Sequence, residues 1–223
     1  MKTLRFIFLS SIFICYLSIP FSFGQNYSLG IKAGPSFSYI TNFSPEAYSQ
    51  KKPLIGVTGG LINNFKLSRI FSLQLEILYV KRGFKEVANG PYSSNATYTH
   101  SVNYINLPLL FNFTFPSGAF SFSGKAGGYC AVALSGKLVA EQSTVWNGTQ
   151  DIEFGNIRKF DAGLCAGVSA GYKLGPGDLF VEARFDYGLT KYKDARYFPN
   201  NLDHAYYSLT TGIGYMLHFS RSK

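Results

Sequence analysis

The chain has 223 residues, of which 46% are hydrophobic, 17% aromatic and only 15% charged, whereas a soluble domain usually carries about 25% charged residues. The aromatic content excludes a disordered chain, and three cysteines are too few for a disulfide scaffold. The formal net charge is +9, but no nucleic-acid-binding motif accompanies it, so we expect no nucleic-acid partner.

The first element in the chain is an export signal. Lys2 and Arg5 precede an apolar run over residues 6–23, and the small residues Ser22 and Gly24 flank its end. This is the pattern of a secretory signal peptide. We therefore expect residues 1–24 to be a signal peptide and residues 25–223 to form one domain.

Apolar and polar residues alternate after the signal. From Tyr27 to Tyr39 every odd residue is apolar, and every even residue is Gly, Ser or Lys. A helix cannot produce a period of two, and no later apolar stretch reaches the roughly 18 residues of a transmembrane helix. The same alternation predicts seven further strands, at residues 54–66, 70–84, 99–115, 119–135, 158–174, 178–192 and 206–219.

The predicted connections alternate in length. Short connections fall at residues 67–69, 116–118 and 175–177, and long ones at 41–53, 85–98, 136–157 and 193–205. This alternation is typical of outer-membrane barrels, whose short turns face the periplasm. We predict an all-β fold, an eight-stranded antiparallel transmembrane up-and-down β-barrel with short periplasmic turns and long extracellular loops, in the outer membrane of a Gram-negative cell.

A secreted soluble barrel such as a lipocalin is the competing interpretation, with its apolar face turned inward around a ligand. The apolar face carries no charge along its middle, and aromatic residues gather at both of its ends. Tyr39, Tyr79 and Tyr187 lie at the outer end, and Phe113 and Phe219 at the periplasmic end. Two aromatic girdles suit a bilayer, so they favour the membrane barrel.

The polar face of such a barrel lines its lumen, where the alternation places five cations and four anions. They are Lys32, Lys125, Lys159, Lys173, Arg184, Glu76, Asp161, Glu182 and Asp186. Eight strands leave room for little more than side chains, and buried charges are costly unless they are paired. We expect a salt-bridge network that plugs the barrel; a narrow or gated conducting path is the alternative, and an open porin does not fit this size.

A second group of cations lies just beyond the outer end of the apolar band, in lipid-facing register. It consists of Lys81, Arg158, Lys191 and Lys193. Such residues can contact outer-membrane lipid and the phosphates of lipopolysaccharide through charge-assisted hydrogen bonds. They can equally extend to the rim to keep their charges in water, and both interpretations stay open.

Catalytic signals are weak. No histidine cluster has the spacing of metal ligands, and no cofactor motif is present. His218 and Ser220 share a strand face and resemble the His-x-Ser of outer-membrane lipid deacylases, but they lie at the periplasmic end with no acid after them. We expect a protein without enzymatic activity, cofactor or metal.

One stretch carries a family resemblance. Residues 104–110, Tyr-Ile-Asn-Leu-Pro-Leu-Leu, resemble the signature of the porin-like, PorT-type eight-stranded barrels of Bacteroidetes, and residues 30–34 and 186–190 are similar to that family as well. The resemblance implies the barrel fold and the outer membrane, and it implies no catalytic residue. One branch of the family acts in type IX protein secretion. Pro108 forfeits a ladder hydrogen bond, so we expect a bulge there.

Two functions of different classes follow from the sequence, besides the lipid-modifying enzyme. In the first, the barrel is a structural or interaction component of the cell envelope, and the loop at 136–157 contacts a protein partner through Trp146, the single tryptophan, because aromatic residues often anchor interfaces. In the second, the barrel passes small solutes through a narrow pore.

Overall fold

The computed structural model describes residues 27–41, 49–90, 93–143, 147–152, 159–190 and 205–219. Their strands are β1 Tyr27–Ile40, β2 Ser49–Lys66, β3 Phe71–Gly90, β4 Ser93–Ser117, β5 Phe120–Glu141, β6 Gly148–Asp151, β7 Phe160–Leu174, β8 Gly177–Gly188 and β9 Tyr206–Phe219. Among these residues no helix is long and apolar enough to cross a membrane. The predicted signal peptide lies outside the described residues and stays a prediction.

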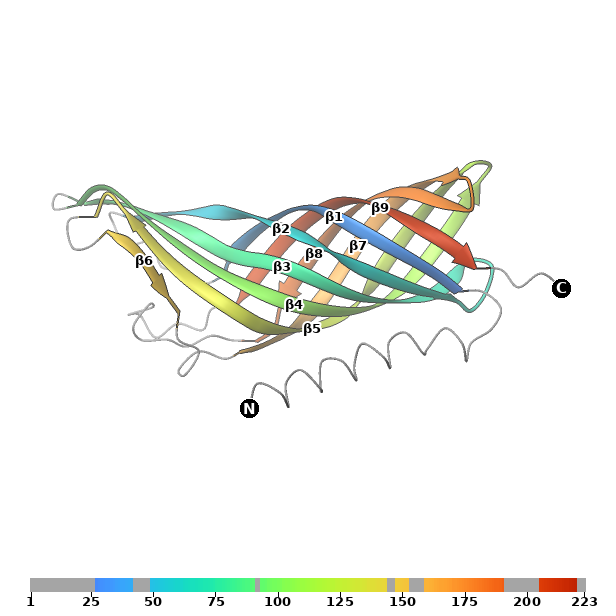
Figure 1. The fold of residues 1–223 in the computed structure, drawn as a ribbon, viewed down its shortest axis with the longest axis horizontal. Coiled ribbons are helices and arrows are strands. Elements are labelled where there is room, and N and C mark those ends of the chain that lie inside the picture. The colour runs from blue at the N-terminus through green and yellow to red at the C-terminus, as the bar shows by residue number, and fades with distance from the viewer. Residues whose placement is uncertain are drawn as a thin grey trace.

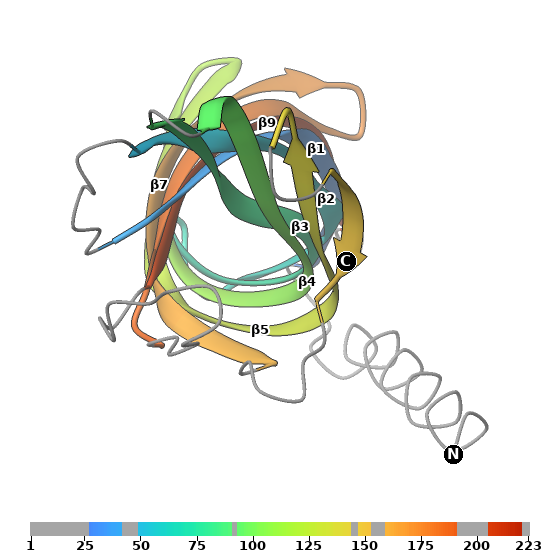
Figure 2. The same ribbon diagram turned by 90° about the vertical axis from the view of Figure 1, so that its left-hand side faces the viewer.

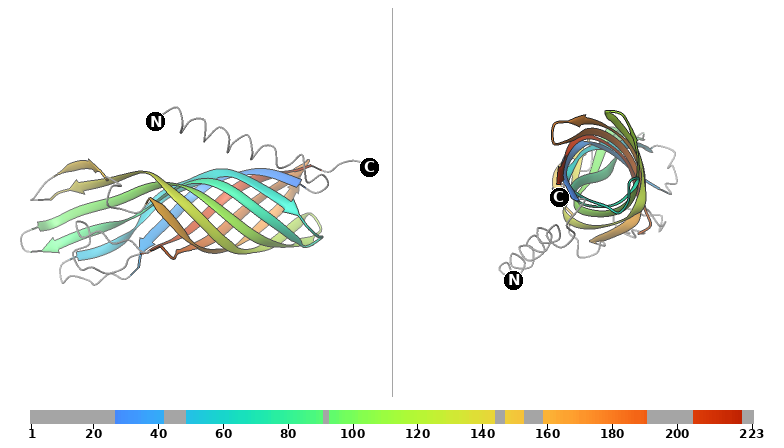
Figure 3. Two further views of the ribbon diagram at one scale, coloured as in Figure 1. Left: turned by 90° about the horizontal axis from the view of Figure 1, so that it is seen from below. Right: turned by 90° about the vertical axis from the view of Figure 1, so that its right-hand side faces the viewer.

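Eight of these strands close into a barrel. Each pairs antiparallel with its neighbour in the chain, β5 pairs with β7, and β1 pairs with β9 from Tyr27 opposite Phe219. The short strand β6 pairs only with the outer part of β5, at residues 137–140. Figure 1 shows the barrel from the side, and the right-hand view of Figure 3 shows the closed ring of strands end on. The predicted eight-stranded antiparallel barrel is therefore confirmed.

Tight turns join the strands at one end, which we call the short-turn end. Gly118, between β4 and β5, and Gly175, between β7 and β8, have φ angles of 66° and 63°, a conformation that residues with a Cβ rarely adopt. Between β2 and β3 the backbone N–H groups of Leu67 and Ser68 both donate to the carbonyl oxygen of Phe71. The short connections lie where the sequence predicts them.

At the opposite end, which we call the outer end, β3, β4 and β5 extend well beyond the other strands. The predicted loop at 85–98 is wrong: β3 continues to Gly90 and β4 begins at Ser93, with Lys85 opposite Thr99. The predicted loop at 136–157 likewise begins as the last part of β5. Figures 1 and 2 show β3, β4, β5 and β6 forming one projecting sheet, here called the outer wall. Outside a membrane both faces of a sheet can be polar, so the apolar alternation weakens although the strands continue.

A bulge on β5 changes which residues face inward. Asn103 lies opposite Ser135 but Tyr104 opposite Ala133, so Leu134 is an extra residue. Below the bulge odd-numbered residues of β5 such as Ala133 are buried, and above it even-numbered ones such as Leu138 are buried. An extra residue in one strand shifts its side-chain alternation in this way.

The bulge expected at Pro108 is absent. The pairing with β5 runs without a shift through Pro108 opposite Tyr129, and the register with β3 is the same on both sides of Pro108. Only the ladder to β3 is broken at the proline itself. The proline therefore interrupts the pairing locally, without inserting a residue.

The outward face of the barrel is apolar and the inward face polar. Ile31 is 60% exposed and Val168 64% exposed on the outside, whereas Gln74 and Asn106 are fully buried inside. A soluble protein has the opposite arrangement, with apolar residues inside and polar residues outside. The arrangement seen here suits a barrel whose outer surface contacts lipid.

Lysine in the middle of the apolar band should be far more costly than lysine near its edge. Ile213 lies midway along β9 and Leu174 at the short-turn end of β7, and both are about half exposed. We expect Ile213→Lys to lower the free energy of unfolding by about 2–4 kcal/mol and Leu174→Lys by about 0–1 kcal/mol. Urea titration of the protein folded in lipid vesicles measures both; equal losses would contradict the position of the band.

Candidate functional site

Eight charged side chains form one continuous chain of ion pairs inside the barrel, which we call the lumen network. Along the chain they are Lys125, Glu182, Lys32, Glu76, Arg184, Asp186, Arg82 and Asp161. They come from β1, β3, β5, β7 and β8, and no side chain among them is more than 5% exposed. The network therefore ties together strands on opposite sides of the lumen.

The two glutamates each bridge two cations. Lys32 Nζ donates to Glu76 Oε1 at 2.9 Å, and Arg184 Nη1 donates to Glu76 Oε2 at 2.6 Å. Glu182 accepts hydrogen bonds from Lys32 and from Lys125 through its two oxygens. Each carboxylate is thus satisfied on both sides, which burial of a charge requires.

The aspartates form the outer half of the network around Arg82. The two terminal nitrogens of Arg82 donate to Asp161 Oδ2 at 2.9 Å and to Asp186 Oδ2 at 3.0 Å. Arg184 Nε lies 3.0 Å from Asp186 Oδ1 and connects the two halves. The guanidinium of Arg82 also lies over the ring of Tyr129, 4.7 Å from its centroid, and the Tyr129 hydroxyl donates to Asp161.

The network corrects the predicted set of lumen charges at three positions. Lys159 precedes β7 and is exposed, and Lys173 is exposed at the short-turn end of β7; both have lumen register, but they lie where the interior meets solvent. Arg82, which the prediction omitted, is 1% exposed. Arg82 and Glu76 are both even-numbered residues of β3 and therefore face the same way. The sequence alternation could thus have placed Arg82 in the lumen. The other seven predicted members are in the network, and its four cations balance its four anions.

Apolar and aromatic side chains are buried above the network. Val102 lies opposite Arg82 in the register of β3 and β4, and His100 lies opposite Phe84 one step further out. The buried residues of this region, here called the outer apolar layer, are Ile40, Phe84, Val102, Tyr104, Leu138, Ile152 and Tyr206. They lie between the charges and the outer end.

His100 belongs to the outer wall, beyond the aromatic girdle. Its ring stacks on that of Phe84, with centroids 4.5 Å apart and an interplanar angle of 12°. Burial, and to a lesser extent the ammonium group of Lys51, lower the pKa of His100 to about 4. The imidazole is therefore neutral at pH 7, and it acts as an aromatic member of the wall.

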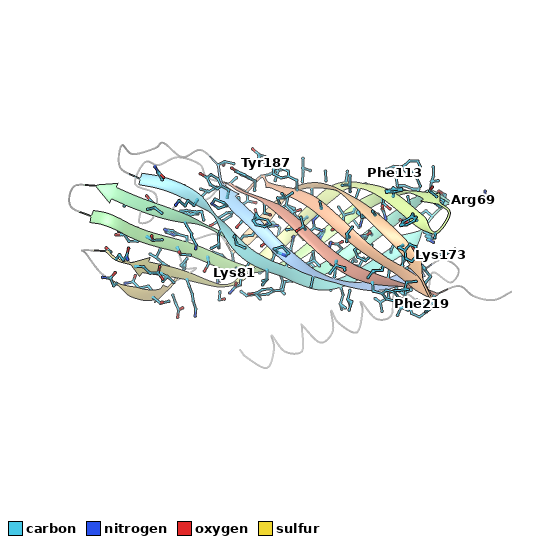
Figure 4. The ribbon with its side chains drawn as sticks, turned by 90° about the horizontal axis from the view of Figure 1, so that it is seen from above. Arg69, Lys81, Phe113, Lys173, Tyr187 and Phe219 are labelled. Carbon is cyan, nitrogen blue, oxygen red and sulfur yellow. The ribbon has the colours of Figure 1, made fainter. Side chains whose placement is uncertain are left out.

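Of the residues predicted to contact lipopolysaccharide or a protein partner, the structure describes Lys81 alone. Lys81 is partly exposed on β3, on the outer side of the barrel and away from the end that holds Phe113 and Phe219, as Figure 4 shows. Arg158, Lys191, Lys193 and Trp146 lie outside the described residues. Contact of these residues with lipopolysaccharide or with a partner stays a prediction.

Ser28, His218 and Asp178 form a hydrogen-bonded chain at the short-turn end. Ser28 Oγ lies 2.8 Å from His218 Nδ1, and His218 Nε2 lies 2.9 Å from Asp178 Oδ2. These are the residue types of a hydrolase relay, but Ser28 is 2% exposed, which leaves its hydroxyl little access to a substrate. The chain links β1, β9 and β8. Ser220, the partner that the sequence suggested for His218, lies outside the described residues.

No metal site accompanies these groups. Within the described ranges, no three His, Cys, Asp or Glu side chains are grouped so that they could hold a metal ion. Cys130 and Cys165 are free thiols.

Comparison with known proteins agrees with this architecture. The sequence model of the outer membrane protein beta-barrel domain matches residues 22–194. A major outer membrane protein from Thermus thermophilus is similar over 88% of this chain and 100% of its own, with 12% identity and a TM-score of 0.53. At this identity the likeness shows the fold alone.

Two further solved structures are similar at lower TM-scores. OprG from Pseudomonas aeruginosa covers 87% of this chain and 98% of its own at 10% identity and a TM-score of 0.47. Ail from Yersinia pestis covers 86% and 99% at 12% identity and a TM-score of 0.42. No curated protein gives a significant match.

Removing one member of the lumen network should destabilise the barrel strongly. We expect Glu76→Leu to lower the free energy of unfolding by about 3–5 kcal/mol, because it takes a carboxylate from two buried cations. Lys159→Gln, which removes an exposed charge, should change it by no more than about 0.5 kcal/mol. Urea titration in lipid vesicles measures both, and a small loss for Glu76→Leu would contradict the structural role of the network.

Proposed function

Because the chain belongs to the outer membrane protein beta-barrel domain family, we propose that it is a non-enzymatic outer-membrane barrel that is closed to solutes and serves as a structural or interaction component of the cell envelope. The observation that carries the proposal is the lumen network. Its eight charges cross the interior and leave no excess charge to attract an ion.

Two layers support closure to solutes. An ion that crossed the barrel would have to separate buried pairs such as Arg184 and Glu76, which are 1% and 0% exposed, and leaving the separated charges buried would be costly. It would then meet the outer apolar layer, where Phe84 is 1% exposed and Val102 is 5% exposed. The alternative, a narrow gated pore, requires both layers to move.

The outer wall supports the interaction role. It extends β3, β4 and β5 beyond the barrel, and β6 adds a short strand with an edge that β5 does not cover. Trp146 precedes β6 in the chain and is the contact residue that we propose for an envelope protein partner. We further propose that Lys81, Arg158, Lys191 and Lys193 contact lipopolysaccharide. The resemblance of residues 104–110 to PorT-type barrels of Bacteroidetes supports a link to a secretion or surface assembly.

A single-channel recording tests closure. The refolded protein in a planar bilayer should give no discrete current steps, and the variants Glu182→Gln and Arg184→Gln should be compared with it. Discrete steps in the unmodified protein, whose size or ion selectivity changes in these variants, would overturn the closed barrel in favour of the narrow pore.

Recovery of a partner from outer membranes tests the interaction role. Tagged protein purified in mild detergent should bring a stoichiometric envelope protein with it, and Trp146→Ala should reduce that recovery at least about fivefold if the tryptophan anchors the interface. Phe160→Ala, a lipid-facing aromatic residue that is 52% exposed, is the matched control. Both variants should keep a gel mobility that changes on boiling. Equal recovery with all three proteins would refute the role of Trp146.

A further inference from the structure

A cavity of about 230 Å³ lies at the short-turn end of the barrel, far from the outer wall. The ends of β2, β7 and β9 and the turn between β2 and β3 supply side chains to it. In Figure 4, Arg69 and Lys173 lie at this same end, near Phe113 and Phe219. The short turns of such barrels face the periplasm, so the cavity opens toward that compartment.

Three cations converge on the cavity. They are Lys66 at the end of β2, Arg69 in the following turn and Lys173 near the end of β7. All three are exposed, and none has an ion pair with the described residues. Among the described residues, the only acidic side chain in the lining is Asp178, which His218 already contacts at 2.9 Å. The cavity therefore has an excess of positive charge, in contrast to the balanced lumen network.

A buried amide lines the same cavity. The Asn64 side chain is 6% exposed, and its Oδ1 has no hydrogen-bond partner in the part of the chain that the structure describes. The hydroxyl groups of Ser72 and Ser121 are also part of the lining. The Asn64 oxygen is an acceptor and does not itself favour an anion. The donors of the lining are therefore the two serine hydroxyl groups and, with the amide turned by 180°, the NH₂ group of Asn64. These neutral donors stand beside the three cations.

We propose that this cavity binds a phosphate-bearing ligand from the periplasmic side. Phosphate is a compact group with several acceptor oxygens, and it suits a site that offers an arginine fork, two ammonium groups and neutral donors together. Two sources supply this chemistry at the level of the short turns, the headgroup of a phospholipid and a soluble phosphate in the periplasm. The inference goes beyond the proposed function, because it assigns a ligand to the end opposite the outer wall.

Phosphate binding by charge variants tests the proposal. The protein in dodecyl maltoside micelles, which carry no phosphate, is titrated with inorganic phosphate by ³¹P NMR; the triple variant Lys66→Gln, Arg69→Gln, Lys173→Gln should bind at least about tenfold more weakly than the unmodified protein. The matched control is Lys52→Gln, Lys85→Gln, Lys137→Gln, which removes three exposed cations toward the outer end, on β2, β3 and β5, and should bind normally.

A second arm uses phosphatidylglycerol. Native mass spectrometry of detergent-solubilised protein should show phosphatidylglycerol retained by the unmodified protein and by the control, and lost from the triple variant, if the ligand is a headgroup. A charge effect with inorganic phosphate alone identifies a soluble ligand instead. Arg69→Glu, a single change in an exposed turn, provides a second variant whose folding is checked by gel mobility before and after boiling. The proposal is overturned if the triple variant and Arg69→Glu match the unmodified protein with both probes, or if the matched control loses binding as strongly.

Discussion

The pairing of buried charges in the lumen network is the interaction on which the barrel most depends. A barrel that turns its apolar face to lipid has no conventional hydrophobic core, so its interior must be held by polar contacts. In this chain the charges alternate in sign along the network, and each inner member contacts two neighbours of opposite charge. The pairs from β3 to β7 and β8 join strands on opposite sides of the ring, so the complete network forms only when the barrel is closed.

Depth along the barrel decides what a charged residue does. Lys125 and Lys173 both have lumen register, yet Lys125 is buried against Glu182 while Lys173 is exposed near the last short turn. Arg82 is the last charge of the network on β3. The next inward-facing residue toward the outer end is Phe84, which belongs to the outer apolar layer. The interior thus passes from a cationic end, through paired charges, to a buried apolar layer, and the two ends of the barrel offer different chemistry.

The alternation of side chains explains both the success and the errors of prediction from the sequence. A period of two predicts the strands and their inward face, and it places seven of the eight network members correctly. It fails over residues 85–98, where the wall leaves the bilayer and polar residues occupy both faces although the strands continue. It also misjudges depth, since register alone cannot separate Lys159 at a strand end from Asp161 inside the barrel. A bulge such as the one at Leu134 switches the inward face without any signal in the composition.

Contacts across the closure of the barrel are the feature least accessible to sequence. Ser28 and His218 are 190 positions apart, yet they lie directly opposite each other because closure pairs the first strand with the last. In the sequence, the hydroxyl nearest to His218 on the same strand face is that of Ser220. Sequence proximity therefore suggests a His218–Ser220 motif and gives no hint of Ser28. Asp178 reaches the same histidine from β8, again through pairing with β9. In a closed sheet the side-chain neighbours are set by register around the ring, so the short-turn end acquires a polar cluster and a cationic cavity that no single strand encodes.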